Sequence, residues 1–331
     1  MQAVGVDVGY GVVKWVGALG SGSFPSVWAP YSPGGETWGI GASGQPLRID
    51  GVAVTVGHQA AGRPRAHRPF GDGRLADPEA LPLLAQALWA TGVQGDIVLG
   101  SGTPLGVFAQ EREAARRALE GRTFTLGDGV RETVIRVARL VLRPQGIGAA
   151  ISLADEGRLP EPPGLLAVLD IGTRTTDVAV LDLADLSPVV PLSWTLEAGI
   201  ASAAEALAAR VQEATGHLPP PDLALAALCG EPTRWRGAPL PAGVEHLDAL
   251  ADTIRSEIRR RFGPDAGRVA AVAPVGGGAA LLADRLAGIL PAETVAIEPQ
   301  AAVLANARGF YATALHLAMD HGHPLGHLAV R

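Results

Sequence analysis

Cysteine and long apolar runs are scarce in this sequence. It contains one cysteine among 331 residues, so no disulfide can form within the chain and no thiolate cluster can bind a metal. That residue, Cys229, lies in the apolar run LALAALCG, which predicts a small buried core residue. No apolar run reaches the roughly 18 residues of a membrane span, and no basic and apolar leader opens the chain. We therefore expect a cytoplasmic protein with no membrane partner.

Positive charge is also limited. The net charge is −6 at pH 7, which gives no general attraction to nucleic acid, so no direct nucleic-acid partner is expected. Of the 27 basic residues, Lys14 is the only lysine, and the others are arginine. Asparagine also occurs once, as Asn306. The position of a single lysine could be a matter of chance. A compact ammonium group suits a phosphate, however, and Lys14 lies inside the first motif of the chain, which favours a functional role.

That motif is GVDVGYGVVKWV, residues 5–16, which has the pattern of a strand, a turn and a second strand. Valines alternate with small or polar residues, as they do in a strand. An ionised carboxylate inside a buried strand is costly unless something binds it, so Asp7 needs a partner. Gly9 and Gly11 mark a sharp turn that a backbone segment or a ligand can approach closely.

The same pattern returns in GLLAVLDIGTRTTDVAVLDL, residues 164–183, where Asp170 and Gly172 take the places of Asp7 and Gly9. Either hairpin alone could be purely structural. Two copies, each beginning one half of the chain, indicate duplicated α/β domains that face each other across a cleft. Turns of this kind can hold an anion, and the two aspartates could then face a hydrated Mg²⁺ on nucleotide phosphates.

A third glycine cluster, Gly276–Gly278, separates the apolar run RVAAVAPV from a helix that is predicted to start near Ala279. Three glycines remove every side chain where a flat ring or a sugar phosphate could lie against the backbone, and a plain turn would rarely need all three. Other familiar motifs are missing from the sequence. It has no G-K-[ST] of a Walker A loop, no complete G-x-G-x-x-G after the strand that ends at Gly100, and no G-x-S-x-G or H-E-x-x-H.

Taken together, these motifs resemble those of the actin-like ATPases, and most closely those of the bacterial and archaeal ParM/StbA group. VGVDVGYGVVKWV is similar to the first phosphate loop of that family, VLDIGTRTTDVAVLD to the second, and VAAVAPVGGGAALL to the adenosine motif. FPSVWAP, DIVLGSGTPLGVFA, VLRPQGIGAA and EPQAAVLANARGFY match further blocks in the expected order. The resemblance implies an α/β protein with the two-domain actin-like (ribonuclease H-like) ATPase fold and a nucleotide cleft between duplicated domains.

The resemblance also implies catalytic roles for three residues. Asp7 and Asp170 would hold the hydrated Mg²⁺, and Gln145 would position the attacking water, with a polar turn residue as its alternative role. Because glutamine cannot act as a base, it would contribute orientation, and electrostatics would supply most of the rate. The implied phosphate and nucleotide contacts are Gly9, Tyr10, Gly11, Lys14, Gly172, Thr173, Arg174, Thr175, Gly276, Gly277 and Gly278.

Several residues fit two interpretations. Arg174 could reach a phosphate or point to solvent, and Asp177 could be a second acid beside the metal or a structural acceptor. Arg210 and Glu213 are weak candidates for contacts to the ribose or base, since a solvated helix face also explains them. The histidine-containing C-terminal tail is interpreted as solvent-exposed, because its spacing fits no standard structural zinc site.

The second half of the chain contains two predicted helices, at residues 199–214 and 250–262, the first entered through a hinge at Gly199. Asn306 and Arg308 are interpreted as hydrogen-bonding residues between elements rather than as catalysts. The expected domains are actin-like domain I, residues 1–150 with a small insert at about 31–74, and actin-like domain II, residues 151–331 with an insert at about 201–265.

The function implied by the resemblance is that of an ATPase that binds and hydrolyses ATP, or GTP, with Mg²⁺ and polymerises into filaments. Such filaments would serve plasmid or DNA segregation or other cytoskeletal positioning, with further copies of the chain and a DNA-binding adaptor protein as partners. Two alternatives stay open. A sugar-kinase-type phosphotransferase needs a catalytic aspartate facing an acceptor hydroxyl, and none stands out between residues 31 and 150. A non-polymerising actin-fold scaffold would carry a membrane- or partner-binding end, and the tail shows no amphipathic anchor.

Overall fold

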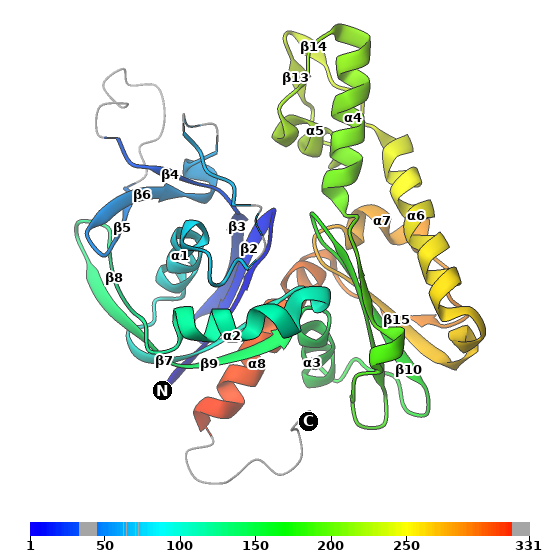
Figure 1. Ribbon diagram of the computed structural model, residues 1–331, viewed down its shortest axis with the longest axis horizontal. Coiled ribbons are helices and arrows are strands. Elements are labelled where there is room, and N and C mark those ends of the chain that lie inside the picture. The colour runs from blue at the N-terminus through cyan, green and yellow to red at the C-terminus, as the bar shows by residue number, and fades with distance from the viewer. Residues whose placement is uncertain (33–44, 62, 64, 70, 72, 320–331) are drawn as a thin grey trace. The chain divides into compact units, whose positions relative to one another are not determined.

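The computed structural model describes residues 1–32, 45–61, 63, 65–69, 71 and 73–319 (Figure 1). The chain forms two compact units, each of which has a sheet with helices packed against it. Unit 1 consists of Met1–Gly157 and the described residues from Leu304 onward, and unit 2 is Arg158–Val303. The histidine-containing tail after residue 319 and a part of the expected insert at 31–74 lie outside the described residues.

A mixed sheet is the framework of unit 1, and its described strands follow the order β3-β2-β1-β7-β9-β8-β5-β6-β4. β1 pairs antiparallel with β2 and parallel with β7, which pairs parallel with β9. β5 and β6, from the expected insert, extend the edge of this sheet. The strands are β1 (Gln2–Val8), β2 (Val12–Gly17), β3 (Gly20–Pro25), β4 (Trp28–Pro30), β5 (Leu47–Ile49), β6 (Val52–Val56), β7 (Gly95–Thr103), β8 (Thr123–Gly127) and β9 (Glu132–Pro144).

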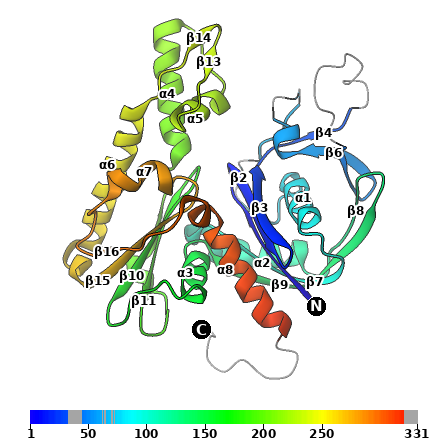
Figure 2. The same ribbon diagram turned by 180° about the vertical axis from the view of Figure 1, so that it is seen from behind.

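Helices cover both faces of this sheet. Leucines of α1 (Leu81–Thr91) share a core with Val4 of β1, whereas Ala314 of α8 (Pro299–Met319) packs with Ala3. Because neighbouring residues of a strand point to opposite faces, β1 is buried on both sides. Figures 1 and 2 show α1 and α8 on the two sides of β1 and β7. The remaining helices of unit 1 are α2 (Phe108–Leu119) and α3 (Ile147–Asp155).

The C-terminal helix approaches the rest of unit 1 at glycines. A Cβ atom built on Gly100 of β7 would lie 2.0 Å from the carbonyl oxygen of Phe310, and one on Gly309 would lie 1.7 Å from the carbonyl oxygen of Gly148. A clash with backbone cannot be relieved by a side-chain rotation, so these positions require glycine. Our expectation that domain II extends to residue 331 therefore differs from the observed contacts, in which the helix packs on unit 1 from Leu304 onward.

Gly100→Ala is expected to lower the free energy of unfolding by roughly 1–3 kcal/mol, because α8 must move away from β7 to admit the methyl group. Denaturant unfolding of the variant and of the unchanged chain measures this difference. Gly267→Ala is the matched control, since a Cβ at Gly267 meets no atom within 4 Å and the backbone there is not left-handed. Equal destabilisation by the two substitutions would show that the close approach of α8 does not matter.

Unit 2 contains a sheet in the order β12-β11-β10-β15-β16. β10 pairs antiparallel with β11 and parallel with β15. Helices α4 and α6 present apolar residues at helical spacing to the core they share with these strands. Both predicted helices are found, although α6 begins at Val244 rather than at residue 250. The elements are β10 (Leu165–Ile171), β11 (Thr176–Asp182), β12 (Trp194–Leu196), α4 (Ile200–Thr215), α5 (Pro221–Leu228), β13 (Arg234–Trp235), β14 (Ala238–Pro239), α6 (Val244–Phe262), β15 (Val269–Val275), α7 (Ala279–Leu286) and β16 (Glu293–Thr294).

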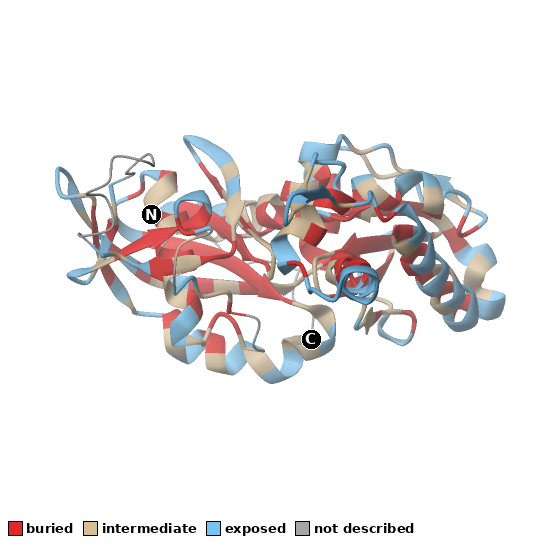
Figure 3. Ribbon diagram, turned by 90° about the horizontal axis from the view of Figure 1, so that it is seen from above, coloured by how far each residue is buried: buried red, intermediate tan, exposed pale blue. Residues whose placement is uncertain are grey.

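Burial follows the sheets and the inner faces of the helices (Figure 3). Cys229 is an exception to our expectation, because it is exposed. The buried residues of its apolar run are Ala224, Ala227 and Leu228 of α5, and the helix ends immediately before the cysteine, which leaves the thiol outside the core. Within the described residues, no helix combines the length and the apolar character needed to cross a membrane.

Candidate functional site

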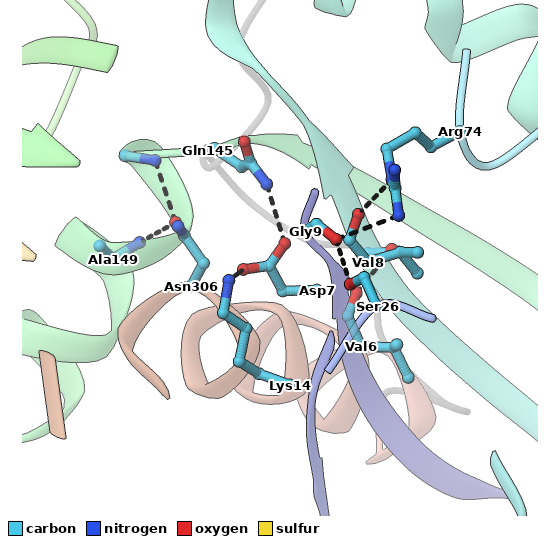
Figure 4. Close-up of polar contacts among 12 residues, drawn as sticks. Val6, Asp7, Val8, Gly9, Lys14, Ser26, Arg74, Gln145, Ala149 and Asn306 are labelled. Carbon is cyan, nitrogen blue, oxygen red and sulfur yellow. Dashed lines mark hydrogen bonds and ion pairs between the residues drawn. The ribbon is translucent and has the colours of Figure 1, made fainter. Parts of the chain in front are cut away.

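Asp7 is the buried carboxylate of the first hairpin, and both of its oxygens have donors within unit 1 (Figure 4). Lys14 lies opposite Asp7 in the antiparallel register, so the two side chains share one face of the sheet. The Lys14 Nζ lies 3.0 Å from Asp7 Oδ2, and the Gln145 amide donates to Oδ1 at 2.8 Å. The Asp7 side chain is only 2% exposed. The partners that the buried charge requires are thus residues of the chain itself.

Gln145 is held in place by the elements around the start of α3. Its backbone N–H donates to the carbonyl of Thr103 at the end of β7, at 2.9 Å. Asn306 Oδ1 of α8 accepts from the N–H groups of Gly146 and Ala149, at 2.9 and 3.1 Å. It takes the part of an N-cap side chain, although it comes from another helix. The single asparagine of the chain therefore anchors the helix that follows Gln145.

The interpretation of Asn306 and Arg308 as hydrogen-bonding residues between elements is confirmed. Asn306 joins α8 to the start of α3, and the Arg308 guanidinium donates to Glu156, just past the end of α3, at 3.0 Å.

Two side chains from outside the first hairpin donate hydrogen bonds to the turn between β1 and β2. Ser26 Oγ donates to the carbonyl of Gly9 at 2.5 Å, and Arg74 Nη2 donates to the same oxygen at 3.0 Å. A Cβ on Gly9 would lie 2.6 Å from the carbonyl oxygen of Val12 and 2.7 Å from Lys14 Nζ. The first of these contacts is with backbone, so the turn needs glycine at this position.

Arg74 is a residue that the sequence did not reveal. It is 6% exposed, its Nε donates to the carbonyl of Val8 at 2.9 Å, and its guanidinium carbon lies 4.7 Å from the centre of the Tyr10 ring. Burial lowers its pKa to about 10, which still leaves the side chain charged at pH 7. No signal could have separated it from the other arginines, because burial of one arginine leaves no mark in the sequence around it.

A pocket lies beside this turn, bounded by Gly9, Tyr10, Arg74, Thr103 and Gln145 among other residues of unit 1. Among the described residues, the buried hydroxyl of Thr103 has no hydrogen-bond partner. A buried hydroxyl without a partner costs about 1–3 kcal/mol.

The second hairpin, in unit 2, repeats the register of the first. Asp170 lies opposite Asp177 across β10 and β11, as Asp7 lies opposite Lys14. The partner position therefore carries a cation in the first hairpin and an acid in the second. Asp177 is 1% exposed and accepts a hydrogen bond from the Thr195 hydroxyl of β12, which gives it a structural acceptor role.

The turn of the second hairpin packs against the start of α4. The Gly172 N–H donates to the carbonyl of Thr175 at 2.8 Å, which closes the turn. The N–H groups of Ile200 and Ala201 donate to the carbonyls of Gly172 and Thr173, at 3.2 and 2.8 Å. Because these contacts join α4 directly to the turn, a movement of α4 would move the turn as well. The hinge at Gly199 stays a prediction.

The glycine cluster lies next to Asp170 in unit 2. A Cβ on Gly276 would lie 2.5 Å from Asp170 Oδ1, and the backbone there has a φ of +87°. The Gly278 N–H donates to the carbonyl of Ile171 at 2.8 Å, and a Cβ at Gly278 would clash with Ile171. Only Gly277 of the three faces open space. Internal packing thus explains two of these glycines, and room for a ligand could explain the third.

Two of the remaining predicted residues of unit 2 have acidic partners. Arg174 lies 3.8 Å from Glu197, and Arg210 donates to Glu245 of α6 at 2.7 Å. Arg210 is ten residues beyond the start of α4, so it lies about 15 Å along the helix from the turn. Glu213 is exposed. The ribose or base contacts of Arg210 and Glu213 stay predictions.

Mg²⁺ is compatible with the acids in both units. Among the described residues, no group of three or more histidines, cysteines or acids could enclose an ion. Mg²⁺ keeps several waters and needs only one or two carboxylates besides phosphate oxygens. A carboxylate also has about four acceptor sites, so Asp7 can accept from a metal-bound water while its present donors stay.

Comparisons with known proteins place this architecture among the actin-like proteins. The family described as actin like proteins N terminal domain matches residues 5–148, and the family described as archaeal actin homologue MreB-like, C-terminal, matches residues 168–288. An archaeal actin homologue from Thermoplasma volcanium is 41% identical over 323 residues, which cover 94% of this chain and 98% of the relative. Another, from Thermoplasma acidophilum, has the same identity and coverage.

Solved structures agree with this placement. The ADP complex of the archaeal actin homologue Ta0583 has a TM-score of 0.82 and 38% identity, and the match covers 96% of this chain and all of that one. A 15-stranded ParM filament from Clostridium botulinum has a TM-score of 0.79 at 20% identity, covering 95% and 99% of the two chains, and it shares the fold. The chain belongs to the actin-like protein family, with archaeal actin homologues among its relatives at about 40% identity. The fold predicted from the motifs is confirmed.

Proposed function

We propose that this chain binds ATP, or GTP, with Mg²⁺, hydrolyses it and assembles into filaments. The proposal rests on two hairpins with the same register, each with a buried aspartate at the end of its first strand and a glycine turn after it. The ADP complex of Ta0583 supports a nucleotide as the ligand. Filament assembly is inferred from family membership, since a ParM of the same fold forms filaments.

Unit 1 would supply a cation and a water-positioning amide. An ammonium group has three donors, and Asp7 uses one of those on Lys14, so two are left for phosphate oxygens. Lys14 Nζ also lies against Gly9, at the turn whose amides would meet the same phosphates. Because a carboxylate can only accept, the Gln145 amide nitrogen faces Asp7, and its oxygen is left to accept from an attacking water.

Unit 2 would supply the second acid and the second turn. Asp170 would accept hydrogen bonds from waters on Mg²⁺, and the turn from Gly172 to Thr175 would offer backbone and hydroxyl donors to phosphate. Bound Mg²⁺ would neutralise charge that develops on the phosphates during transfer. Gly277, which faces open space, is the position of its cluster where a nucleoside could lie against backbone.

The purified chain is expected to bind one nucleotide, to release phosphate from ATP or GTP, and to sediment at high speed when Mg²⁺ and nucleotide are present. Removing Mg²⁺ with EDTA should stop both phosphate release and sedimentation, because the phosphate charge is then not neutralised. ADP release that depends on an added sugar, without sedimentation, would instead identify a phosphotransferase. Nucleotide binding with neither hydrolysis nor sedimentation would identify a scaffold.

The cellular role is the part of the proposal that depends on the family resemblance alone. Segregation of plasmid or other DNA through a DNA-binding adaptor is the role we infer from the ParM resemblance, with cytoskeletal positioning as the broader form. The net charge of −6 supports an adaptor rather than direct contact with nucleic acid.

A further inference from the structure

Arg74 holds the turn between β1 and β2 by its backbone carbonyls. Its guanidinium donates to the carbonyls of Val8 and Gly9 (Figure 4). It also donates to the carbonyl of Pro69 and lies over the ring of Tyr10. Two of these carbonyls belong to consecutive peptide groups of the turn. A planar guanidinium suits such an arrangement, because its donors point in several fixed directions at once.

The direction of these two carbonyls determines the direction of two amides. In a trans peptide group the C=O and the following N–H point in opposite directions. The carbonyl of Val8 is paired with the N–H of Gly9, and that of Gly9 with the N–H of Tyr10. With both carbonyls turned toward Arg74, the two N–H groups point away from it, and successive amides with a common direction can hold an anion.

We propose that Arg74 is a positioning residue that keeps the turn of the first hairpin in the conformation that binds nucleotide phosphates. This inference rests on the proposed function for its ligand, but the conformation it assigns exists without nucleotide. Ser26 alone would hold one of the two carbonyls, that of Gly9. Arg74 is therefore the residue that fixes the orientation of the Val8–Gly9 peptide group.

Comparing two ligands, one with phosphates and one without, distinguishes a role of Arg74 in phosphate binding from a general effect on folding. Arg74→Met is expected to weaken ATP binding about tenfold or more, the change that follows loss of one charge-assisted hydrogen bond. Adenosine, which has no phosphate, should bind the variant as it binds the unchanged chain. Arg74→Lys keeps the charge but can reach fewer carbonyls, so it should restore a part of the ATP affinity.

The matched control is Arg63→Met. Arg63 Nε donates to the carbonyl of Gln59 at 2.7 Å. Like Arg74 it donates to a backbone carbonyl, but this carbonyl does not belong to the turn between β1 and β2. Equal ATP affinity of Arg74→Met and the unchanged chain would overturn the inference, and so would a loss of adenosine binding equal to the loss of ATP binding. If Arg74→Met does not fold, the ATP affinity of Arg74→Lys tests the inference instead. Unchanged ATP affinity of Arg74→Lys would contradict it, because the positioning role requires several donors in fixed directions.

A nucleotide-free measurement separates this inference from the proposed function. Hydrogen exchange of a peptide containing Gly9 and Tyr10 should be faster in Arg74→Met than in the unchanged chain, and unaffected in Arg63→Met. Equal exchange rates in all three would refute the positioning role even if ATP binds. If instead the unchanged chain binds no nucleotide while exchange changes as expected, the proposed function fails and the assigned conformation stands.

Discussion

Asp170→Ala is expected to abolish nucleotide hydrolysis, with a loss of phosphate release of about 10²–10³-fold or more, the size found when a charge-stabilising group is removed from an active site. Asp170 is buried at the end of β10, close against Gly276. The acid opposite it, Asp177, already accepts a hydrogen bond from the Thr195 hydroxyl, so we expect no replacement from that side. Phosphate release at saturating ATP and Mg²⁺ measures the effect. Thermal unfolding checks that the variant is folded.

Asp182→Ala is the control for this variant. Asp182 ends the second strand of the same hairpin and bonds the N–H of Ala184, so it is an acid on the same element with a purely local contact. We expect near-normal phosphate release from Asp182→Ala. Phosphate release from Asp170→Ala at the rate of the unchanged chain would mean that the second hairpin takes no part in the reaction.

Gln145→Ala is expected to slow hydrolysis by about 10²-fold, as for loss of one oriented polar group, while leaving nucleotide affinity nearly unchanged. The reason is the geometry around Asp7: Gln145 contacts this carboxylate, and Lys14 still holds the other oxygen when the amide is removed. Single-turnover hydrolysis and an equilibrium titration with nucleotide measure the two quantities separately.

Gln94→Ala, which removes an exposed glutamine, serves as the control for the amide. An affinity loss in Gln145→Ala as large as its loss of rate would refute the water-positioning role. It would leave Gln145 as a structural residue that supports Asp7.

The hairpin motifs could be predicted because their structure depends on residues that are close together in the sequence. A buried aspartate at the end of a strand, followed by a glycine turn, has the same meaning in both halves of the chain, and the shared register of Asp7 and Asp170 follows from equal spacing. Lys14 stands out because no other lysine competes with it. Helix α4 was predicted from its apolar spacing after Gly199, which precedes its first residue.

Contacts across long sequence separations could not be predicted in the same way. Gln145 is 138 positions from Asp7, and Asn306 is 160 from Gly146, and no local pattern records such a pairing. Arg74 is one arginine among many, and its role depends on hydrogen bonds to carbonyls far away in the sequence, such as those of Val8 and Gly9. In the third glycine cluster, close packing is a second reason for Gly276 and Gly278 that the sequence alone did not show, and the predicted nucleotide contacts there stay predictions.

The central claim is that both hairpins bind the phosphates of one nucleotide, and a structure of the chain with a non-hydrolysable ATP analogue and Mg²⁺ tests it most directly. The account predicts one analogue per chain, with Lys14 and the turn from Gly172 to Thr175 both within hydrogen-bond distance of its phosphates. An analogue whose phosphates touch only one of the two hairpins would contradict it.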